Sequence, residues 1–158
     1  MTNSYSADYF LNGQVLLIDK PLTWTSFDAV NKIRYNIRKE YNIRKIKVGH
    51  AGTLDPLATG LLIICTGRFT KKINEYMGLP KEYTGSIQLG ASTPSYDLET
   101  QIDHNFPVDH INQSLVDSIK GQFLGSIEQI PPVFSAIKKD GEKAYEAARR
   151  GESIEMKS

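Results

Sequence analysis

The sequence predicts one globular domain of the α/β or α+β class, built on a sheet of mixed strand direction. Short apolar runs typical of strands alternate with segments whose apolar residues recur every three or four positions, as in helices. The regular spacing of βαβ units is missing, which favours a mixed sheet. The composition fits a folded chain, because 40% of its 158 residues are hydrophobic, 23% are charged, and only 12 are glycine and 7 proline.

The first predicted elements are a strand and a helix. Apolar residues over 15–19 predict a short strand, which ends at Lys20-Pro21 because proline cannot donate to a strand ladder. Thr25 followed by Asp28 has the spacing of a capping box, which marks the start of a helix. Apolar residues then recur at steps of three or four, and they predict one buried helix face: Phe27, Val30, Ile33, Ile37 and Tyr41.

The rest of the chain is predicted to form shorter elements. Glycines and a proline make the stretch over 48–56 rich in turns, and the continuously apolar run over 61–65 predicts a buried strand. Apolar spacing and turn residues predict the remaining elements: helices over 70–77, 115–123 and 142–150, a strand over 81–89, extended pieces over 127–130 and 134–138, and a turn at Asp140-Gly141.

Simple counts exclude several classes of protein. The longest apolar runs have four and five residues, whereas a membrane-spanning helix needs roughly 20. No secretory signal is recognisable at the N-terminus, and the single cysteine, Cys65, rules out an internal disulfide and a cysteine-cluster zinc site. Phosphate-loop, Gly-x-Ser-x-Gly and His-Glu-x-x-His motifs are also absent. We therefore expect a cytoplasmic protein without a metal or another cofactor.

Charge is unevenly distributed along the chain. The formal net charge is +1, but residues 32–47 contain seven basic residues and one acid, Glu40, a local excess of +6. This excess has two interpretations. It can be the solvated outer face of the predicted helix. Alternatively, it can form a positive surface for a polyanion, because lysines and arginines that approach phosphates release condensed counterions.

The most unusual run lies between this basic segment and the strand over 61–65. Residues 49–60 read Gly-His-Ala-Gly-Thr-Leu-Asp-Pro-Leu-Ala-Thr-Gly. Pro56 disfavours helical backbone at Asp55, and the nearby glycines allow another chain or a ligand to approach closely. An aspartate held in this way can act as a nucleophile, although Asp-Pro is equally common in structural turns. His50 alone does not separate a packed histidine from a functional one.

Several motifs together resemble the TruB family, the bacterial pseudouridine synthases that modify the T-loop of transfer RNA. The resemblance runs from about residue 13 to residue 157 and rests on these segments: Lys20-Pro21 with Thr25-Ser26, residues 49–62, Lys81-Glu82-Tyr83, residues 127–132 and 134–138, Gly141, Tyr145, Ala148-Arg149 and Gly151. It implies the pseudouridine synthase fold, with a largely antiparallel mixed sheet and flanking helices. It also implies that residues 1–158 are the N-terminal part of the catalytic domain, a fold incomplete at its C-terminus without the second half and the C-terminal RNA-binding region.

The resemblance assigns roles to individual residues. It implies that Asp55 is the catalytic aspartate of a T-loop uridine isomerase, that His50 stacks in the RNA beside the extruded uridine, and that Tyr83 packs against the target base. The reaction breaks the N1–C1′ bond, turns the uracil and rejoins it through C5. Three routes remain open for the carboxylate, namely attack on C1′, addition to uracil C6, or support for loss of the 2′ proton. With transfer RNA as the partner, the predicted RNA-binding residues are Lys20, Lys45, Lys47 and Arg68.

Two departures from the family pattern lead to an alternative hypothesis. Where the family shows Thr-Asp-Thr-x-Asp, this chain has Thr93-Pro94-Ser95-Tyr96-Asp97, so Asp97 is predicted as a supporting substrate-binding residue. A Gly-Thr-Tyr-Ile-Arg-like motif, whose arginine pairs with the catalytic aspartate in the family, is not among these 158 residues. Because an opposite charge keeps a buried carboxylate ionised, the chain alone is predicted to be weakly active or inactive. The alternative function is an RNA-binding module that keeps the fold without the chemistry.

Overall fold

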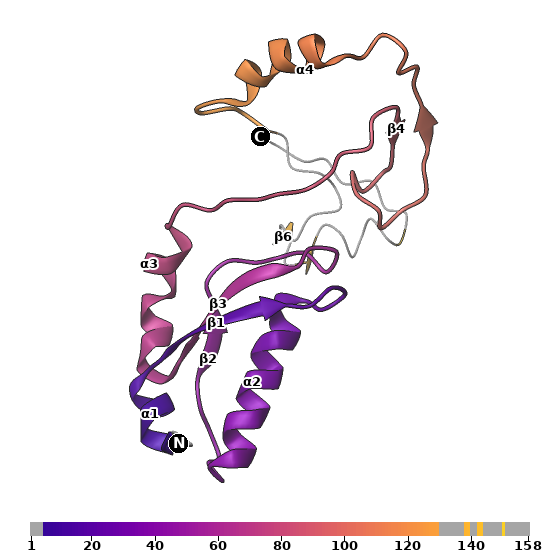
Figure 1. The fold of residues 1–158 in the computed structure, drawn as a ribbon. Helices are drawn as coiled ribbons and strands as arrows, with labels where there is room; N and C mark the ends of the chain where they lie inside the picture. Colours follow the sequence, from indigo (N-terminus) through magenta and orange to yellow (C-terminus); the bar gives the residue numbers. More distant parts are fainter. Residues whose placement is uncertain (1–4, 130–137, 140–141, 144–149, 151–158) are drawn as a thin grey trace. The chain divides into compact units, whose positions relative to one another are not determined.

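A computed structural model describes residues 5–129, 138–139, 142–143 and 150 of the chain. The chain divides into two compact units, residues 1–84 and residues 85–158. Helices and antiparallel strands occur together, which confirms the predicted α+β class (Figure 1). The first unit contains these elements in order: α1 Ala7–Asn12, β1 Val15–Lys20, α2 Ser26–Glu40, β2 Val48–His50, β3 Gly60–Thr66, the 3₁₀ helix η1 Gly67–Lys72, and α3 Ile73–Met77.

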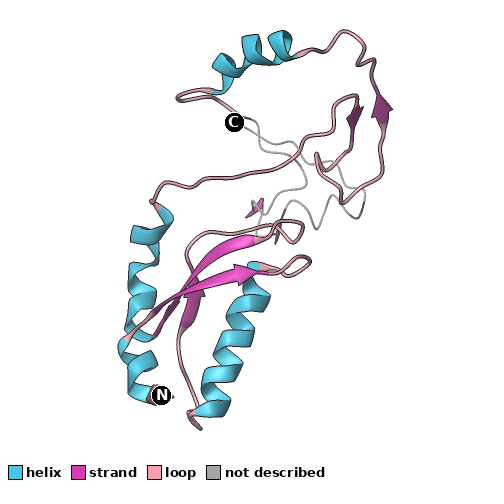
Figure 2. Ribbon diagram, in the orientation of Figure 1, coloured by secondary structure: helices cyan, strands magenta, loops and turns pink. Residues whose placement is uncertain are grey.

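A three-stranded antiparallel sheet forms the centre of the first unit, with the strand order β1-β3-β2 (Figure 2). Lys20 pairs with Gly60 at one end of β3, and His50 of β2 pairs with Ile64. The strands predicted over 15–19 and 61–65 are confirmed. β2 lies at the start of the stretch over 48–56, for which the sequence predicts turns throughout. Pairing with the apolar β3 keeps its three residues extended, so the turns begin only after His50.

The helix α2 begins where the capping box predicts it. The Thr25 hydroxyl accepts a hydrogen bond from the Asp28 backbone N–H at 3.0 Å, and the Asp28 carboxylate accepts one from the Thr25 N–H at 2.9 Å. The Thr25 hydroxyl also donates to the Asp28 carboxylate at 2.6 Å, and this bond, followed by the one from the Thr25 N–H, holds the pKa of Asp28 below its ordinary value of 3.8. The first turn of α2 is therefore fixed by the side chains of Thr25 and Asp28.

The apolar face of α2 packs on the sheet and forms the core of the first unit. Val30 and Ile37 of the predicted face are buried, and Ile33 and Tyr41 pack against them while partly buried. Phe27 is predicted to be in the core, and this prediction is wrong, since Phe27 is 58% exposed. It lies at the edge of the buried face, with the Arg34 guanidinium 5.9 Å from its ring centre. The buried cluster consists of Ala29, Val30, Ile37, Ile46, Val48, Leu62 and Ile64.

Helix α3 lies on the other side of the sheet from α2 (Figure 1). A Cβ atom on Gly49 of β2 would lie 2.8 Å from Ile73 Cδ1, so the glycine permits this close packing. Gly67 opens η1 with a φ of 51°, and a Cβ there would overlap the carbonyls of Phe10 and Leu11 in α1. The prediction of a helix over 70–77 is confirmed by η1 and α3 together, whereas α1 is an element that the sequence does not predict.

The second unit contains short elements within its described residues: β4 Ala91–Ser92, β5 His104–Asn105, α4 Gln113–Ile119, the 3₁₀ helix η2 Lys120–Phe123, β6 Lys138–Lys139 and β7 Glu142–Lys143. β4 pairs with β5, and β6 pairs with β7, both antiparallel. The helix predicted over 115–123 is confirmed by α4 and η2. An Asn112 side chain that accepts the Leu115 N–H at 3.0 Å fixes the start of α4.

Some predicted elements differ from the structure. Residues 81–89 form no strand, and Tyr83 and Ile87 there are 72% and 87% exposed. Alternating apolar residues give a strand only where a partner edge accepts its hydrogen bonds, and no described strand pairs with this segment. Residues 127–129 likewise have no regular structure. The prediction of a helix over 142–150 is wrong at its first two residues, because Glu142 and Lys143 form β7. The remaining parts of the predicted extended pieces, turn and helix lie outside the described residues, namely 130, 134–137, 140–141 and 144–149.

Candidate active site

The loop that connects β2 to β3, residues 51–59, is fixed by hydrogen bonds at three points. Ala51 N–H donates to the Ile63 carbonyl at 2.8 Å, which closes the loop on β3. The Ser26 hydroxyl, at the start of α2, accepts from Leu54 N–H at 2.9 Å and donates to the Leu54 carbonyl at 3.2 Å. Ser26 is only 2% exposed, so these bonds are shielded from water.

A third bond follows immediately along the chain. Thr23 N–H donates to the Pro56 carbonyl at 2.7 Å. Asp55 therefore stands between two residues whose backbones are both held, Leu54 by Ser26 and Pro56 by Thr23. Asp55 itself is exposed, and among the described residues its carboxylate has no hydrogen-bond or ion-pair partner. The loop thus presents one carboxylate to solvent from a backbone that is rigidly placed.

The backbone of Thr23 is strained. Its φ of 71° is in the left-handed region, which is rare for a β-branched residue and costs of order 1–3 kcal/mol. The strained conformation directs the Thr23 N–H toward the Pro56 carbonyl. The bond between Thr23 and Pro56 thus holds a strained residue close to an exposed aspartate.

The loop that contains Thr23 is held in turn by Lys20. The Lys20 side chain is completely buried, and its ammonium donates to the carbonyls of Trp24 at 2.6 Å and Pro21 at 3.1 Å. Hydrogen bonds to carbonyls replace the water that the buried cation has lost. The structure thus gives Lys20 an internal role in shaping residues 21–24, and the predicted contact with RNA does not fit a side chain without exposed surface.

His50 lies at the end of β2, immediately before the fixed loop. It is half-buried, and its Nδ1 is 2.7 Å from the Gly52 carbonyl. A carbonyl only accepts, so Nδ1 donates the hydrogen in this contact. The bond holds the imidazole at the base of the loop that presents Asp55.

Tyr83 belongs to a segment that passes close to the same loop. The Lys81 ammonium donates to the carbonyls of Met77 at 2.6 Å and Leu79 at 3.0 Å, which fixes the segment to the end of α3. A Cβ atom on Gly52 would lie 3.8 Å from Lys81 Cε, so the Lys81 side chain runs alongside the loop. Tyr83, two residues further on, is 72% exposed, and its ring is accessible to a ligand.

Three of the four predicted RNA-binding residues line one groove in the first unit. Lys45, Lys47 and Arg68 meet at the start of η1, where Gly67 N–H donates to the Lys47 carbonyl at 2.8 Å. The groove encloses about 320 Å³ and is lined by Leu11, Lys45, Ile46, Lys47, Gly67, Arg68, Thr70 and Lys71. No acidic side chain is part of this lining, so it concentrates positive charge.

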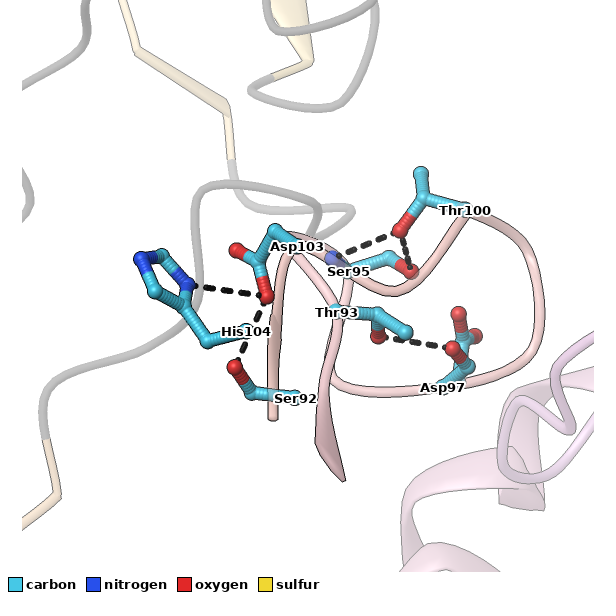
Figure 3. Close-up of polar contacts among 7 residues, drawn as sticks. All are labelled: Ser92, Thr93, Ser95, Asp97, Thr100, Asp103 and His104. Carbon is cyan, nitrogen blue, oxygen red and sulfur yellow. Dashed lines mark hydrogen bonds and ion pairs between the residues drawn. The ribbon is translucent and has the colours of Figure 1, made fainter. Parts of the chain in front are cut away.

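Asp97 lies in the second unit, in the long loop between β4 and β5 (Figure 3). Its carboxylate accepts the Glu99 N–H at 2.9 Å, and its carbonyl accepts the Thr93 hydroxyl at 2.7 Å. The same loop is closed where the Ser95 and Thr100 hydroxyls meet at 2.7 Å. These contacts give Asp97 a defined local conformation, within the second unit.

A serine, an aspartate and a histidine meet at the base of the same loop without forming a catalytic triad (Figure 3). The Ser92 hydroxyl donates to Asp103 at 2.7 Å, and His104 Nδ1 lies 3.2 Å from the same carboxylate oxygen. The bond from Ser92, followed by the neighbouring His104, holds the pKa of Asp103 below its ordinary value. Because the aspartate stands between the other two side chains, the histidine cannot take the serine proton directly, as nucleophilic catalysis requires.

Sequence reasoning missed the residues that hold the site. Ser26 and Thr23 both contact the Asp55 loop, yet Ser26 was recognisable only as part of the Thr25-Ser26 motif and Thr23 carried no signal. Within the described residues, no group of three or more histidine, cysteine or acidic side chains could bind a metal ion. None of the described helices is long and apolar enough to cross a membrane.

Comparisons with known proteins give matches that share one family description. A family model described as TruB family pseudouridylate synthase (N terminal domain) matches residues 38–158. Three curated relatives carry the name tRNA pseudouridine synthase B. The one from Flavobacterium johnsoniae is 63% identical over 150 residues, which are 94% of this chain and 66% of the relative. The one from Phocaeicola vulgatus is 58% identical over 149 residues, 94% of this chain and 63% of the relative. The one from Chlorobium chlorochromatii is 49% identical over 142 residues, which are 90% of this chain and 55% of the relative. The chain thus spans between 55% and 66% of the length of these relatives.

Proposed function

This chain belongs to the TruB family of pseudouridylate synthases, and on that premise we propose that it supplies the catalytic aspartate of a transfer RNA pseudouridine synthase. The proposed substrate is the uridine of the T-loop, and the proposed nucleophile or base is Asp55. The observation that carries the proposal is the hydrogen bonding on both sides of Asp55, by Ser26 at Leu54 and by Thr23 at Pro56.

The chemistry requires a carboxylate that is accessible and well positioned. The N1–C1′ bond breaks, the uracil turns within the site, and a new bond forms between C5 and C1′, while the C5 hydrogen leaves as a proton and N1 gains a proton. Isomerisation of this kind is redox-neutral, so the same atoms reappear in the product apart from the exchanged proton. Attack on C1′, addition to C6 and support for 2′ proton loss all place one Asp55 oxygen beside the sugar or base. Because the backbone is rigid, the carboxylate has less orientational freedom to lose when the substrate binds.

Access to a uridine within an RNA loop requires base flipping, which costs a few kcal/mol in stacking and pairing. We assign His50 to the space that the extruded base leaves, because its ring is held by Gly52 on the same loop as Asp55. We assign Tyr83 to the face of the target base, because its exposed ring follows the Lys81 segment that runs beside Gly52. Asp97 remains a proposed supporting contact from the second unit.

Phosphate contacts complete the proposed RNA interface. Lys45, Lys47 and Arg68 are exposed and share one groove, which fits contact with consecutive phosphates better than three scattered cations would. Lys20 is left out of this interface because it is buried and already bonded to two carbonyls. Its proposed contribution is to the shape of the loop that contains Thr23.

Release of tritium from uracil C5 tests the proposal. A T-arm stem-loop labelled with tritium at uracil C5 is incubated with the full-length protein, and the label in water is counted. Asp55→Asn keeps the size of the side chain and removes its charge, so we expect it to abolish release while the RNA still binds. Asp19→Asn removes another exposed carboxylate, from β1, and serves as the matched control, with unchanged release. Undiminished release by the Asp55 variant would refute the assignment.

The second candidate function is an RNA-binding module that performs no chemistry. One observation favours it, since no lysine or arginine among the described residues contacts the Asp55 carboxylate. A neighbouring cation normally keeps such a carboxylate ionised and oriented when substrate covers it. Tight binding of the stem-loop, with tritium release no faster than for Asp55→Asn, would identify the module rather than the enzyme.

A further inference from the structure

The single tryptophan of the chain lies outside the core of the first unit. Trp24 stands in the short connection between β1 and α2, and it is 37% exposed. Within the part of the chain that the structure describes, its indole forms no hydrogen bond and stacks on no other ring. Tryptophan is highly buried on average in proteins, and a buried indole N–H usually finds a hydrogen-bond acceptor. The packing of the first unit therefore does not account for this side chain.

The backbone that carries Trp24 is fixed at three consecutive residues. The Trp24 carbonyl accepts a hydrogen bond at 2.6 Å from the completely buried Lys20 ammonium. Thr23, which precedes it, donates its N–H to the loop between β2 and β3 at 2.7 Å. Thr25, which follows it, is the N-cap of α2 and is bonded within the capping box. The accessible indole is thus attached to a backbone with little freedom to move, as a preformed ligand contact requires.

Two hydrogen bonds align the connection around Trp24 with the loop around Asp55. They join the same two segments at two points, from Thr23 N–H to the Pro56 carbonyl and from Leu54 N–H to the Ser26 hydroxyl. Because the later residue of one segment is bonded to the earlier residue of the other, the segments run in opposite directions. Trp24 and Asp55 both lie between the two bonds. Each is one residue from the pair Thr23 and Pro56, a step of about 3.8 Å between Cα atoms.

Two further apolar side chains are exposed beside the same bonds. Leu22 precedes Thr23, Leu57 follows Pro56, and both are exposed. We call Leu22, Trp24 and Leu57 the apolar rim of the site. Exposed apolar side chains that gather around a solvent-facing carboxylate fit a ligand with flat apolar faces and polar edges. A nucleobase has both properties, and unstacked bases of RNA loops stack on aromatic side chains.

We propose that Trp24 is a further substrate-binding residue, whose indole stacks on the base next to the uridine that meets Asp55. The inference rests on the proposed function for its ligand, and it adds a contact to that function. Tyr83 is assigned there to the target base and His50 to the space that this base leaves. Extrusion of the uridine also removes a stacking partner from its neighbours, and the indole replaces that partner for one of them. Trp24 takes no proton in the reaction, so its loss raises KM more than it lowers kcat.

Binding of the T-arm stem-loop to the full-length protein, measured by fluorescence anisotropy, tests the proposal. Trp24→Leu keeps an apolar side chain and removes the ring, and we expect it to raise Kd by about 5- to 150-fold, the range for one base stacked on an aromatic side chain. Trp24→Phe keeps a ring and should retain most of the affinity. Tyr35→Leu is the matched control, because it removes another exposed ring roughly 13 Å along α2 from its first residue. We expect an unchanged Kd for this control.

Two modified stem-loops identify the contact as stacking on a base. Each lacks one nucleobase, on the 5′ or the 3′ side of the target uridine, and keeps its sugar and phosphate. For one of the two, the missing base should weaken binding to the unaltered protein and have little further effect on Trp24→Leu, because the two changes remove the same contact. If neither modified stem-loop shows this coupling, the inference is overturned. Equal losses in Trp24→Leu and Tyr35→Leu, or in Trp24→Leu and Trp24→Phe, also contradict it.

The fluorescence of Trp24 gives a measurement on the unaltered protein, which does not depend on the stability of Trp24→Leu. The difference in emission between the unaltered protein and Trp24→Phe isolates this indole, and saturating stem-loop should quench it. Unchanged emission would count against stacking.

Tritium release separates this inference from the proposed function. Release that depends on Asp55, together with Trp24→Leu binding and reacting like the unaltered protein, would sink the inference and leave the isomerase. Coupling between Trp24 and one base without any release would leave the inference and sink the isomerase. Melting temperatures check that each variant folds.

Discussion

The two units of the chain differ in the sign of their charge. Residues 1–84 contain twelve basic and seven acidic residues, whereas residues 85–158 contain seven basic and eleven acidic ones. The overall charge of +1 therefore combines a unit of +5 with one of −4. Residues 82–119 include six acids and no lysine or arginine. A polyanion would be attracted to the first unit rather than to the second, so the net charge of a whole chain can hide a positively charged part of it.

The units also differ in how their residues are packed. All nine buried apolar residues found in the described part of the chain belong to the first unit. In the second unit, Tyr96, Ile87 and Leu98 are 79%, 87% and 88% exposed. Local polar contacts such as Ser92 with Asp103 fix its loops instead. Stability is then unevenly distributed, and the rigid unit is the one that presents Asp55.

The largest expected effect compares the core of one unit with the surface of the other. Ile64→Ala removes a completely buried side chain from β3, and we expect a loss of about 2–5 kcal/mol in the free energy of unfolding. Leu98→Ala removes an apolar side chain that is 88% exposed, and we expect a change within about 0.5 kcal/mol. Denaturant unfolding followed by circular dichroism measures both. Similar losses at the two positions would show that the second unit buries Leu98 and that the contrast in packing is wrong.

A smaller effect compares two serine hydroxyls that both bond to backbone. Ser26→Ala removes a buried hydroxyl and leaves the half-buried Leu54 N–H without its acceptor, and we expect a loss of about 1–3 kcal/mol in stability. Ser118→Ala removes an exposed hydroxyl that donates to the Leu115 carbonyl at 2.7 Å, where water replaces the lost bond. We expect a change within about 0.5 kcal/mol at Ser118.

The same pair of serines also tests the role of the fixed loop. Because Ser26 holds the residue before Asp55, Ser26→Ala should lower kcat for tritium release while the Kd for RNA stays unchanged. Ser118→Ala should change neither. A drop in stability at Ser26 without any change in kcat would mean that the bond only stabilises the fold. Denaturant unfolding and steady-state tritium release provide the two measurements.

Local signals explain which parts of the fold could be predicted. The capping box at Thr25 and Asp28 depends on residues three apart, and the strands over 15–19 and 61–65 are marked by apolar runs. The strand predicted over 81–89 fails because a strand depends on a partner elsewhere in the chain. The sheet order β1-β3-β2 is likewise nonlocal, since β3 lies between two strands that precede it.

The sequence indicates candidate site residues, but it does not indicate the hydrogen bonds that hold the loop around Asp55. Asp55 and His50 stand in one unusual run, and the resemblance to the TruB family is what predicts a role for each of them. The bond between Ser26 and Leu54 joins residues 28 apart, and nothing in the local sequence indicates it. The role of Thr23 is even harder to predict from sequence, because a β-branched residue is rarely found at a φ of 71°. Lys20 shows the reverse case, in which a basic residue suggests RNA contact but the fold uses the cation internally.

The smallest expected effect compares the helix caps of the two units. Thr25→Ala and Asn112→Ala each remove one side chain that accepts a backbone N–H at the start of a helix. Each should cost about 1 kcal/mol in the free energy of unfolding at neutral pH. α2 has 15 residues and packs on the core, whereas α4 has seven and none of them is buried, so Thr25→Ala should have the larger effect on thermal unfolding.

The two helix caps are also expected to differ in how their contribution to stability depends on pH. The pKa of Asp28 lies below its ordinary value of 3.8 in the folded chain, so its contribution to stability is present above pH 3.8 and is lost as the pH falls through the lower folded value. Thr25→Ala removes the main cause of that lowering, and its effect on the melting temperature should therefore diminish in strong acid. The Asn112 cap contains no group that titrates, so the effect of Asn112→Ala should not follow the protonation of its own cap. Melting curves recorded from pH 7 to pH 2 measure both effects, and a Thr25→Ala effect that is constant across this range would rule out the carboxylate as the partner that matters in the capping box.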